Sequence, residues 1–328
     1  MTRPVKVELS AVIVTLETQA GQARPMVLTP QGAQGRDLPT AAFDPDRDRT
    51  LHQALGESVE ARTGLRLDYI EQLYTFGDPR RTTAADGARR PYRIGGEPHT
   101  VSIGYLALVP PEAAQAASDW TPWAHWFPWE DRREDRRDGP PAILRDVILP
   151  RLAEWAGRSG ERRERLELLF GTGAAGWRDE LTLERYELLY SARLVREMWR
   201  DQGDVGGEDP PPDLPALGAT APRDHRRILA TAIGRLRGKL KYRPVLFELM
   251  GETFTLTELQ RAAEAVSGMA LHKQNFRRMV ERSGLIEPTG TSSTRLGGRP
   301  AAEYRFGAEA IWERRAATVR FGGARRGG

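Results

Sequence analysis

The sequence contains no cysteine, which excludes disulfide bonds and thiolate metal ligands. Its histidines lie far apart, without the spacing of metal ligands: His52, His99, His125, His225 and His272. No apolar run approaches the roughly 18 residues that a membrane span needs. The N-terminal segment lacks the long apolar core and the cleavage site of a secretory signal. We therefore expect a cytoplasmic protein with no metal site and no membrane partner.

Basic residues are concentrated in the C-terminal third. Residues 223–328 hold 21 Lys and Arg against 10 Asp and Glu, a net charge of +11, which leaves 28 basic and 35 acidic residues, net −7, in residues 1–222. This segregation indicates a polyanion as the partner of the C-terminal part. An arginine-rich genome is the plainer explanation, but it does not predict the acidic N-terminal part.

The N-terminal pattern is that of an α+β domain. Apolar, β-branched residues predict strands at 7–17 and 101–110, and a further strand at 65–76. A helix is predicted over 49–64, with Leu51, Leu55 and Val59 at helical spacing and Gly64 at its end. The loops at 30–47 and 77–98, rich in Gly and Pro, are expected to carry little regular structure.

Residues 120–202 are expected to complete the core. The tryptophan cluster "WTPWAHWFPWE" favours a core or domain edge over a ligand site. Helical segments follow at 142–156 and 181–201, the second with an apolar stripe that must pack on another element or a second subunit. Residues 203–222 have little to bury, which is typical of a mobile linker.

The C-terminal module is predicted to contain four helices and a hairpin. Helices at 224–240 and 244–250 would form its scaffold. The next helix begins with a capping box, in which Thr255 and Glu258 cap each other's backbone N–H, and ends at Gly268. A helix over 272–284 and a hairpin with a Gly-rich tip over 285–306 then complete a winged helix-turn-helix.

The helix at 272–284 has the composition of a DNA-recognition helix. Phe276, Met279 and Val280 are predicted to be its buried face. The candidate DNA-binding residues are the base-facing Gln274, Arg278 and Arg282, the flanking Asn275 and Arg277, the backbone-facing His272 and Lys273, and Arg295 and Arg299 in the wing. The alternative is a solvated, arginine-bearing surface helix.

These residues resemble the Nudix-related transcriptional regulators of NAD metabolism. The phrases "YRPVLFELM", "NFRR" followed by "SGLIE", and "GRPAAEYRF" carry the resemblance over residues 225–306, and "LYTFGDPRR" and "GYLALVP" extend it to the N-terminal part. The chain is most similar to the branch that regulates de novo NAD synthesis in alphaproteobacteria. The resemblance implies a Nudix-like α/β/α sandwich joined to a winged helix-turn-helix domain.

The motif that makes a Nudix domain catalytic is missing. That motif, G-x5-E-x7-R-E-U-x-E-E-x-G-U (U, aliphatic), supplies glutamates that hold Mg²⁺. When the motif is aligned on Gly64 and Leu65, its paired glutamates fall on Ala61 and Arg62. Glu57 and Glu60 remain on the helix but out of register. We therefore expect no catalytic residues and no diphosphate hydrolysis.

The resemblance further implies an adenine-containing effector: ADP-ribose, NAD or ATP. The candidate effector-binding residues are Arg80 and Arg81 for phosphates, Tyr74 or Phe76 for stacking on a base, and Arg62 for the diphosphate. For Arg80 and Arg81 the alternative is a solvated turn, and for Phe76 it is a core aromatic.

The sequence as a whole predicts a homodimeric, nucleotide-responsive regulator, a repressor of NAD-biosynthesis genes, that reads a palindromic operator in double-stranded DNA. The expected parts are a Nudix-like effector domain (1–158), a helical connector (159–202), a flexible linker (203–222), the winged helix-turn-helix domain (223–321) and a disordered tail (322–328). The rivals are an active Nudix-type hydrolase of NAD- or ADP-ribose-like diphosphates with a nucleic-acid tether, and a module that binds another protein.

Overall fold

The computed structural model describes residues 4–19, 21–32, 35–78, 99–135, 139–174, 176–202, 210–241, 245–294 and 300–307. At its centre lies a six-stranded sheet in the order β6-β7-β1-β2-β8, with β5 paired to β1. Its strands are β1 (Val5–Gln19), β2 (Gln22–Leu28), β5 (Thr40–Ala42), β6 (Tyr69–Phe76), β7 (His99–Leu108) and β8 (Trp120–Pro122). β1 and β7 run parallel, and the other pairs are antiparallel. The three predicted strands are confirmed.

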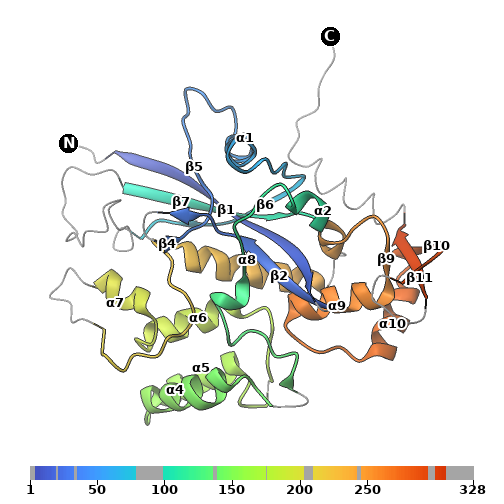
Figure 1. Ribbon diagram of the computed structural model, residues 1–328. Coiled ribbons are helices and arrows are strands. Elements are labelled where there is room, and N and C mark those ends of the chain that lie inside the picture. Colours follow the sequence, from blue (N-terminus) through green and yellow to red (C-terminus); the bar gives the residue numbers. More distant parts are fainter. Residues whose placement is uncertain are drawn as a thin grey trace.

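Helix α1 (Leu51–Thr63) and the short α2 (Pro111–Ala114) cover one face of this sheet (Figure 1). Thr50 accepts a hydrogen bond from the backbone of Gln53 at the start of α1, and Gly64 ends it with φ of 72°. Leu55 and Val59 are buried in a cluster with Leu9, Ile13 and Tyr105. The predicted helix is confirmed. The loop expected at 30–47 was wrong in part, because β5 and the small ladder of β3 (Gln31–Gly32) and β4 (Gly35–Arg36) lie within it.

Helix α8 (His225–Leu240) lies across the opposite face (Figure 1). A Cβ at Gly104 of β7 would lie 3.0 Å from Ile228 Cγ2, so the glycine lets the helix approach closely. We expected α8 to belong to the scaffold of the C-terminal module alone. Instead it packs on β1, β6 and β7 as well as on the C-terminal helices, because both of its sides find a buried partner.

A helical layer lies below α8 (Figure 1). It consists of the π-helical η3 (Ile143–Ile148), α4 (Leu149–Ala156), α5 (Gly160–Phe170), α6 (Thr182–Ser191) and α7 (Arg196–Gln202). The prediction of a single helix over 181–201 was wrong. Helix α6 ends at Ser191, Arg193 adopts a φ of 62°, and α7 begins at Arg196. The stripe packs within the chain, because α6 contacts α8. Trp123, Trp126 and Trp129 are buried, as a core role predicts.

The segment expected to be a mobile linker is partly packed. Leu217 and Ala221 are buried, and Ala219 N donates to His125 O at 2.8 Å, beside the 3-10 turn η2 (Trp123–His125). Residues 210–222 therefore pack against the rest of the protein through Leu217, Ala219 and Ala221. Residues 203–209 and the tail at 322–328 lie outside the described residues.

The C-terminal part forms a winged helix. Its elements are the 3-10 helix η4 (Val245–Leu249), α9 (Leu256–Ser267), α10 (Lys273–Arg282), and a sheet in the order β10-β11-β9. Its strands are β9 (Phe254–Thr255), β10 (Ile286–Ser293) and β11 (Ala301–Phe306). The predicted capping box is present: Thr255 N donates to Glu258 Oε2 at 2.7 Å, and Glu258 N donates to Thr255 Oγ1 at 3.2 Å. Within the described ranges, no helix is long and apolar enough to cross a membrane.

Candidate nucleic-acid interface and ligand site

Helix α10 carries most of the candidate DNA-binding residues on its outer surface. Phe276 and Val280 are buried and face the rest of the module. The exposed residues are His272, Lys273, Gln274, Asn275, Arg278, Glu281 and Arg282, whereas Arg277 is half-buried. The helix is thus strongly amphipathic, with one narrow apolar side and a broad polar one.

The prediction that Met279 is buried was wrong, because its side chain is 62% exposed. At 100° per residue, Met279 lies about 80° from the centre of the face that Phe276 and Val280 form. That places it at the rim of the buried face. It therefore shares the outer surface with the polar residues.

The cations of this surface face solvent. No described carboxylate lies within ion-pair distance of Lys273, Arg278 or Arg282. Arg278 Nη2 donates to Asn275 Oδ1 at 2.8 Å, one helical turn away, which orders the guanidinium. An ordered guanidinium beside an amide, on a helix surface with unneutralised positive charge, suits base edges and phosphates in a major groove.

The turn that presents α10 is held by α9. Glu264 Oε1 accepts from Leu271 N at 2.9 Å, and Gln260 Nε2 donates to Leu271 O at 3.3 Å. The strands β10 and β11 form the predicted wing. Its candidate phosphate contacts, Arg295 and Arg299, lie outside the described residues.

Helix α1 carries the residues onto which the Nudix motif was aligned in the sequence. Arg62 donates to Ser58 Oγ at 2.7 Å and to the Thr40 carbonyl, so a guanidinium stands where the motif has a carboxylate. Glu57 accepts from Gln53 at 2.7 Å, and Glu60 pairs with Arg66 at 3.7 Å. In the part of the chain that the structure describes, no three His, Cys, Asp or Glu side chains group together as metal ligands.

The structure does not bring the candidate effector residues together. Tyr74 is 67% exposed on β6, and its ring meets the half-buried Phe76 edge-on at 5.6 Å. Phe76 packs with the cluster on the α8 face, whereas Arg62 lies on α1 across the sheet. Arg62 and Phe76 therefore lie on opposite sides of the sheet, and the partly buried Phe76 packs as the alternative of a core aromatic describes. Arg80 and Arg81 lie outside the described residues.

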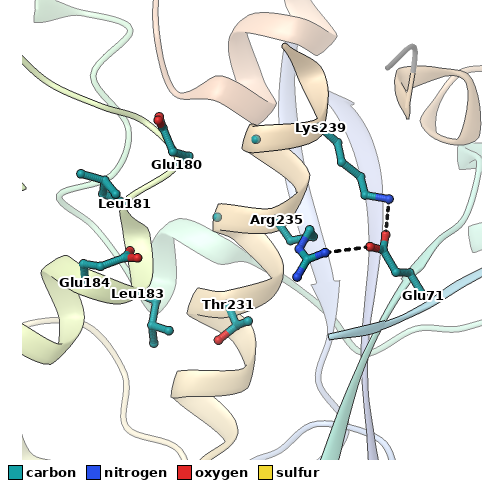
Figure 2. A pocket seen from close by; sticks show the side chains of 10 residues that line it. Glu71, Glu180, Leu181, Leu183, Glu184, Thr231, Arg235 and Lys239 are labelled. Atoms are coloured by element: carbon teal, nitrogen blue, oxygen red, sulfur yellow. Dashed lines mark hydrogen bonds and ion pairs between the residues drawn. The ribbon is translucent and has the colours of Figure 1, made fainter. Parts of the chain in front are cut away.

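A cleft of about 740 Å³ lies between α6, α8 and β6 (Figure 2). Its size is that of a small-molecule site. Two cations of α8, Arg235 and Lys239, converge on Glu71 of β6 at 3.2 and 2.5 Å. Leu181, Leu183 and Glu184 from the start of α6 form the opposite wall.

The mouth of this cleft also holds a charged pair. Burial raises the pKa of Glu180, but several hydrogen bonds, of which the one from Lys241 Nζ at 2.6 Å contributes most, together outweigh it and lower the pKa to about 2. Sequence reasoning missed the cleft. Arg235 and Lys239 stand one helical turn apart, but their helix was assigned to another part of the molecule.

The buried cations of α8 form ion pairs with the acidic N-terminal part. Arg226 pairs with Glu197 at 3.2 Å, and Arg227 pairs with Glu187 at 2.6 Å. Arg237 pairs with the buried Glu130. Part of the charge segregation in the sequence thus reflects contacts inside the molecule, so the charge difference alone overstated the evidence for a polyanion.

Comparison with known proteins agrees with this architecture. Residues 246–306 match the NrtR DNA-binding winged helix domain family. Crystal structures of Shewanella oneidensis NrtR, with a 27mer DNA and without it, have the same fold: each is 21% identical and covers 93% of this chain and 95% of that chain, with TM-scores of 0.51 and 0.50. The chain therefore shares the overall fold of NrtR and ends in a winged helix domain.

A relative of known name matches part of this chain. The "ADPR responsive transcriptional repressor NtrR" of Acinetobacter baylyi is 43% identical over 83 residues, 25% of this chain. The match spans about a third of that relative's length, 33%. In its winged helix domain and in its overall fold, the chain is similar to NrtR proteins.

Proposed function

We propose that this chain is a nucleotide-responsive DNA-binding repressor of NAD-biosynthesis genes. The outer surface of α10 carries this proposal, since it holds three exposed cations without a described carboxylate partner beside an ordered Arg278–Asn275 pair. Arg278 and Gln274 would read base edges, and Lys273 would neutralise a phosphate. The matching winged helix family and the DNA-bound NrtR of the same fold support this assignment.

The effector in this proposal is an adenine nucleotide, with ADP-ribose as the first candidate and NAD and ATP as alternatives. The name of the Acinetobacter relative supports ADP-ribose. Two places offer cations for its phosphates: Arg62 on α1, and Arg235 with Lys239 in the cleft between α6 and α8. They lie on opposite faces of the sheet, so substitutions distinguish them.

Diphosphate hydrolysis is not part of the proposal. A guanidinium cannot ligate Mg²⁺, and Arg62 stands where the Nudix motif has a carboxylate. Incubation with Mg²⁺ and NAD or ADP-ribose should release no AMP. Release of AMP at the rate of an enzyme would favour the rival function, an active Nudix-type hydrolase.

We further propose that the protein acts in the cytoplasm as a homodimer on a palindromic operator. Winged helices commonly read half-sites about one or two helical turns apart, and a twofold dimer matches such a site. A monomeric mass at micromolar concentration would contradict the dimer.

The deciding experiment combines calorimetry with gel shifts on the DNA that lies upstream of the protein's own gene. NAD, ATP and ADP-ribose are titrated separately, and each complex is then tested for a change in DNA affinity. We expect one nucleotide to bind and to change the affinity. Arg62→Ala and Arg235→Ala, measured in parallel, assign the nucleotide to one face of the sheet. DNA binding that survives Arg278→Ala with Gln274→Ala would exclude α10 as the reading element.

A further inference from the structure

The end of α9 is tied to the N-terminal core by a buried ionic cluster of Glu130, Arg185 and Arg237. All three side chains are at most 1% exposed. Arg185 of α6 donates to both carboxylate oxygens of Glu130, at 2.6 and 2.8 Å, and Arg237 of α8 donates to the same carboxylate. One carboxylate thus joins the tryptophan-rich segment, α6 and α8.

Arg237 extends this cluster into the winged helix. Its Nε donates to Val266 O, in the last turn of α9, at 3.0 Å, and its Nη2 donates to Glu130 O at 3.1 Å. Gly268 follows with φ of 70°, and a Cβ there would lie 2.3 Å from Glu130 O. Arg132 N also donates to Gly268 O at 2.7 Å. The end of α9 is therefore held against the backbone of residues 130–132 at close contact distance.

The turn after Gly268 transmits this position to α10. Glu264 and Gln260 of α9 form hydrogen bonds with the backbone of Leu271 in the turn. These bonds hold the start of α10 close to α9. On its other side, α8 packs on the sheet and lines the cleft of Figure 2. A shift of α8 would reach α9 through the guanidinium of Arg237.

We propose that Arg237 and Glu130 are positioning residues, which set the orientation of the recognition helix relative to the Nudix-like domain and transmit the effector signal to DNA. The inference rests on the proposed function. A buried ion pair is weak evidence for stability by itself, since apolar groups of similar volume often serve equally well. Arg237, however, also donates to three backbone carbonyls, those of Asp179, Glu130 and Val266, and the last two join residues 130–132 to the end of α9. These bonds set the position of the end of α9 relative to residues 130–132 of the N-terminal core.

The test compares Arg237→Lys with Arg227→Lys. Lysine keeps the charge opposite Glu130 but cannot span its carboxylate and the backbone carbonyls at once. Arg227 is a matched control on the same helix, only 2% exposed, whose bonds run to Glu187 and Asp224 instead of α9. For each protein we would measure the affinity for NAD, ATP and ADP-ribose and the ratio of DNA affinities with and without the nucleotide that binds.

In Arg237→Lys we expect the nucleotide affinity to stay within about twofold while the ratio, typically about 5- to 150-fold in coupled systems, falls below about twofold. Arg227→Lys should keep the wild-type ratio. A wild-type ratio in Arg237→Lys would overturn the inference. A wild-type protein that binds no DNA, or whose DNA affinity no nucleotide changes, would instead overturn the proposed function, and the inference with it.

Two further measurements cover the case in which Arg237→Lys does not fold. The triple variant Glu130→Met, Arg185→Met, Arg237→Met removes the whole cluster without leaving a charge unpaired, and we expect it to bind DNA without responding to nucleotide. In the wild type, nucleotide binding should change amide hydrogen exchange in a peptide spanning 262–272. Unchanged exchange in that peptide would contradict the proposal.

Discussion

Helices α8 and α10 both belong to the basic C-terminal third, but their cations have opposite environments. In α8, Arg226, Arg227 and Arg237 are at most 2% exposed, and each pairs with a carboxylate from the acidic N-terminal part. In α10, Arg278 and Arg282 are exposed and pair with no described carboxylate. The same residue type stabilises the junction of the two parts in one helix and is available to an external polyanion in the other.

The comparison shows why net charge is a poor guide to a binding surface. The positive charge available to an external polyanion is the part left after internal pairing, and among the described residues α10 carries such charge. Apart from Arg237, which also bonds to α9, substitutions of the buried cations in α8 should therefore act on stability, and substitutions in α10 should act on DNA affinity.

The largest effect is expected at Arg226. Arg226→Met would leave Glu197, 1% exposed, as a buried charge without its guanidinium partner, which typically lowers the free energy of unfolding by about 3 to 5 kcal/mol. Urea denaturation measures this. Arg278→Met on α10 is the matched control and should change the free energy of unfolding by at most about 0.5 kcal/mol. Adding Glu197→Leu should restore much of the loss, and an Arg226→Met protein as stable as the wild type would refute the contrast.

DNA affinity should show the reverse pattern. Arg278→Ala should lower affinity for the operator by about 1 to 3 kcal/mol and relax specificity at one base pair, because a guanidinium that forks onto a guanine is lost. Fluorescence anisotropy over a set of single-base operator variants measures both. Arg235→Ala on α8, 48% exposed, is the control and, measured without nucleotide, should leave DNA affinity within about twofold. Equal losses in both variants would mean that the cations act only through overall charge.

Much of the winged helix could be predicted because its signals are local. The Thr255–Glu258 capping box spans one helical turn, and the period of α10 correctly placed Phe276 and Val280 inside. Strands β1, β6 and β7 were predictable for the same reason, whereas β2, β5 and β8 were not predicted. The exposure of Met279 was not predicted, because the spacing of apolar residues does not show how wide the buried face of a helix is.

The junction could not be predicted, because its partners are distant in sequence. Arg237 and Glu130 are 107 residues apart, and Arg226 and Glu197 are 29 apart. An apolar stripe shows that α8 buries a face, but not whether the sheet or α9 covers it. The break after α6 was hidden in the same way, since the apolar pattern continues through Leu194 and Val195, both buried. The candidate effector residues were chosen by residue type alone, and residue type did not show that Arg62 and Phe76 lie on opposite faces of the sheet.

The smallest effect concerns the start of α8, where stability should depend on pH. His225 is buried beside Asp37 and Glu8, with Arg223 also in contact with both carboxylates. Burial lowers the pKa of His225, but Asp37 and Glu8 outweigh it, so the pKa lies above its usual value. A raised folded-state pKa stabilises the protein below the unfolded pKa, about 6.5, and this contribution is lost as pH rises through the folded value.

The free energy of unfolding should therefore fall as the pH rises above about 6.5, by at most about 1.4 kcal/mol per pH unit for one proton. His225→Gln should abolish this fall. Glu8, whose pKa stays lowered by His225 and Arg223 although burial raises it, is ionised throughout this window and adds no slope. Burial lowers the pKa of His52, so its contribution has the opposite sign, and His52→Gln should make the fall steeper. If His225→Gln leaves the fall unchanged, the pairing of His225 with Asp37 and Glu8 does not stabilise the fold, and the contrast between α8 and α10 does not extend to the first turn of α8.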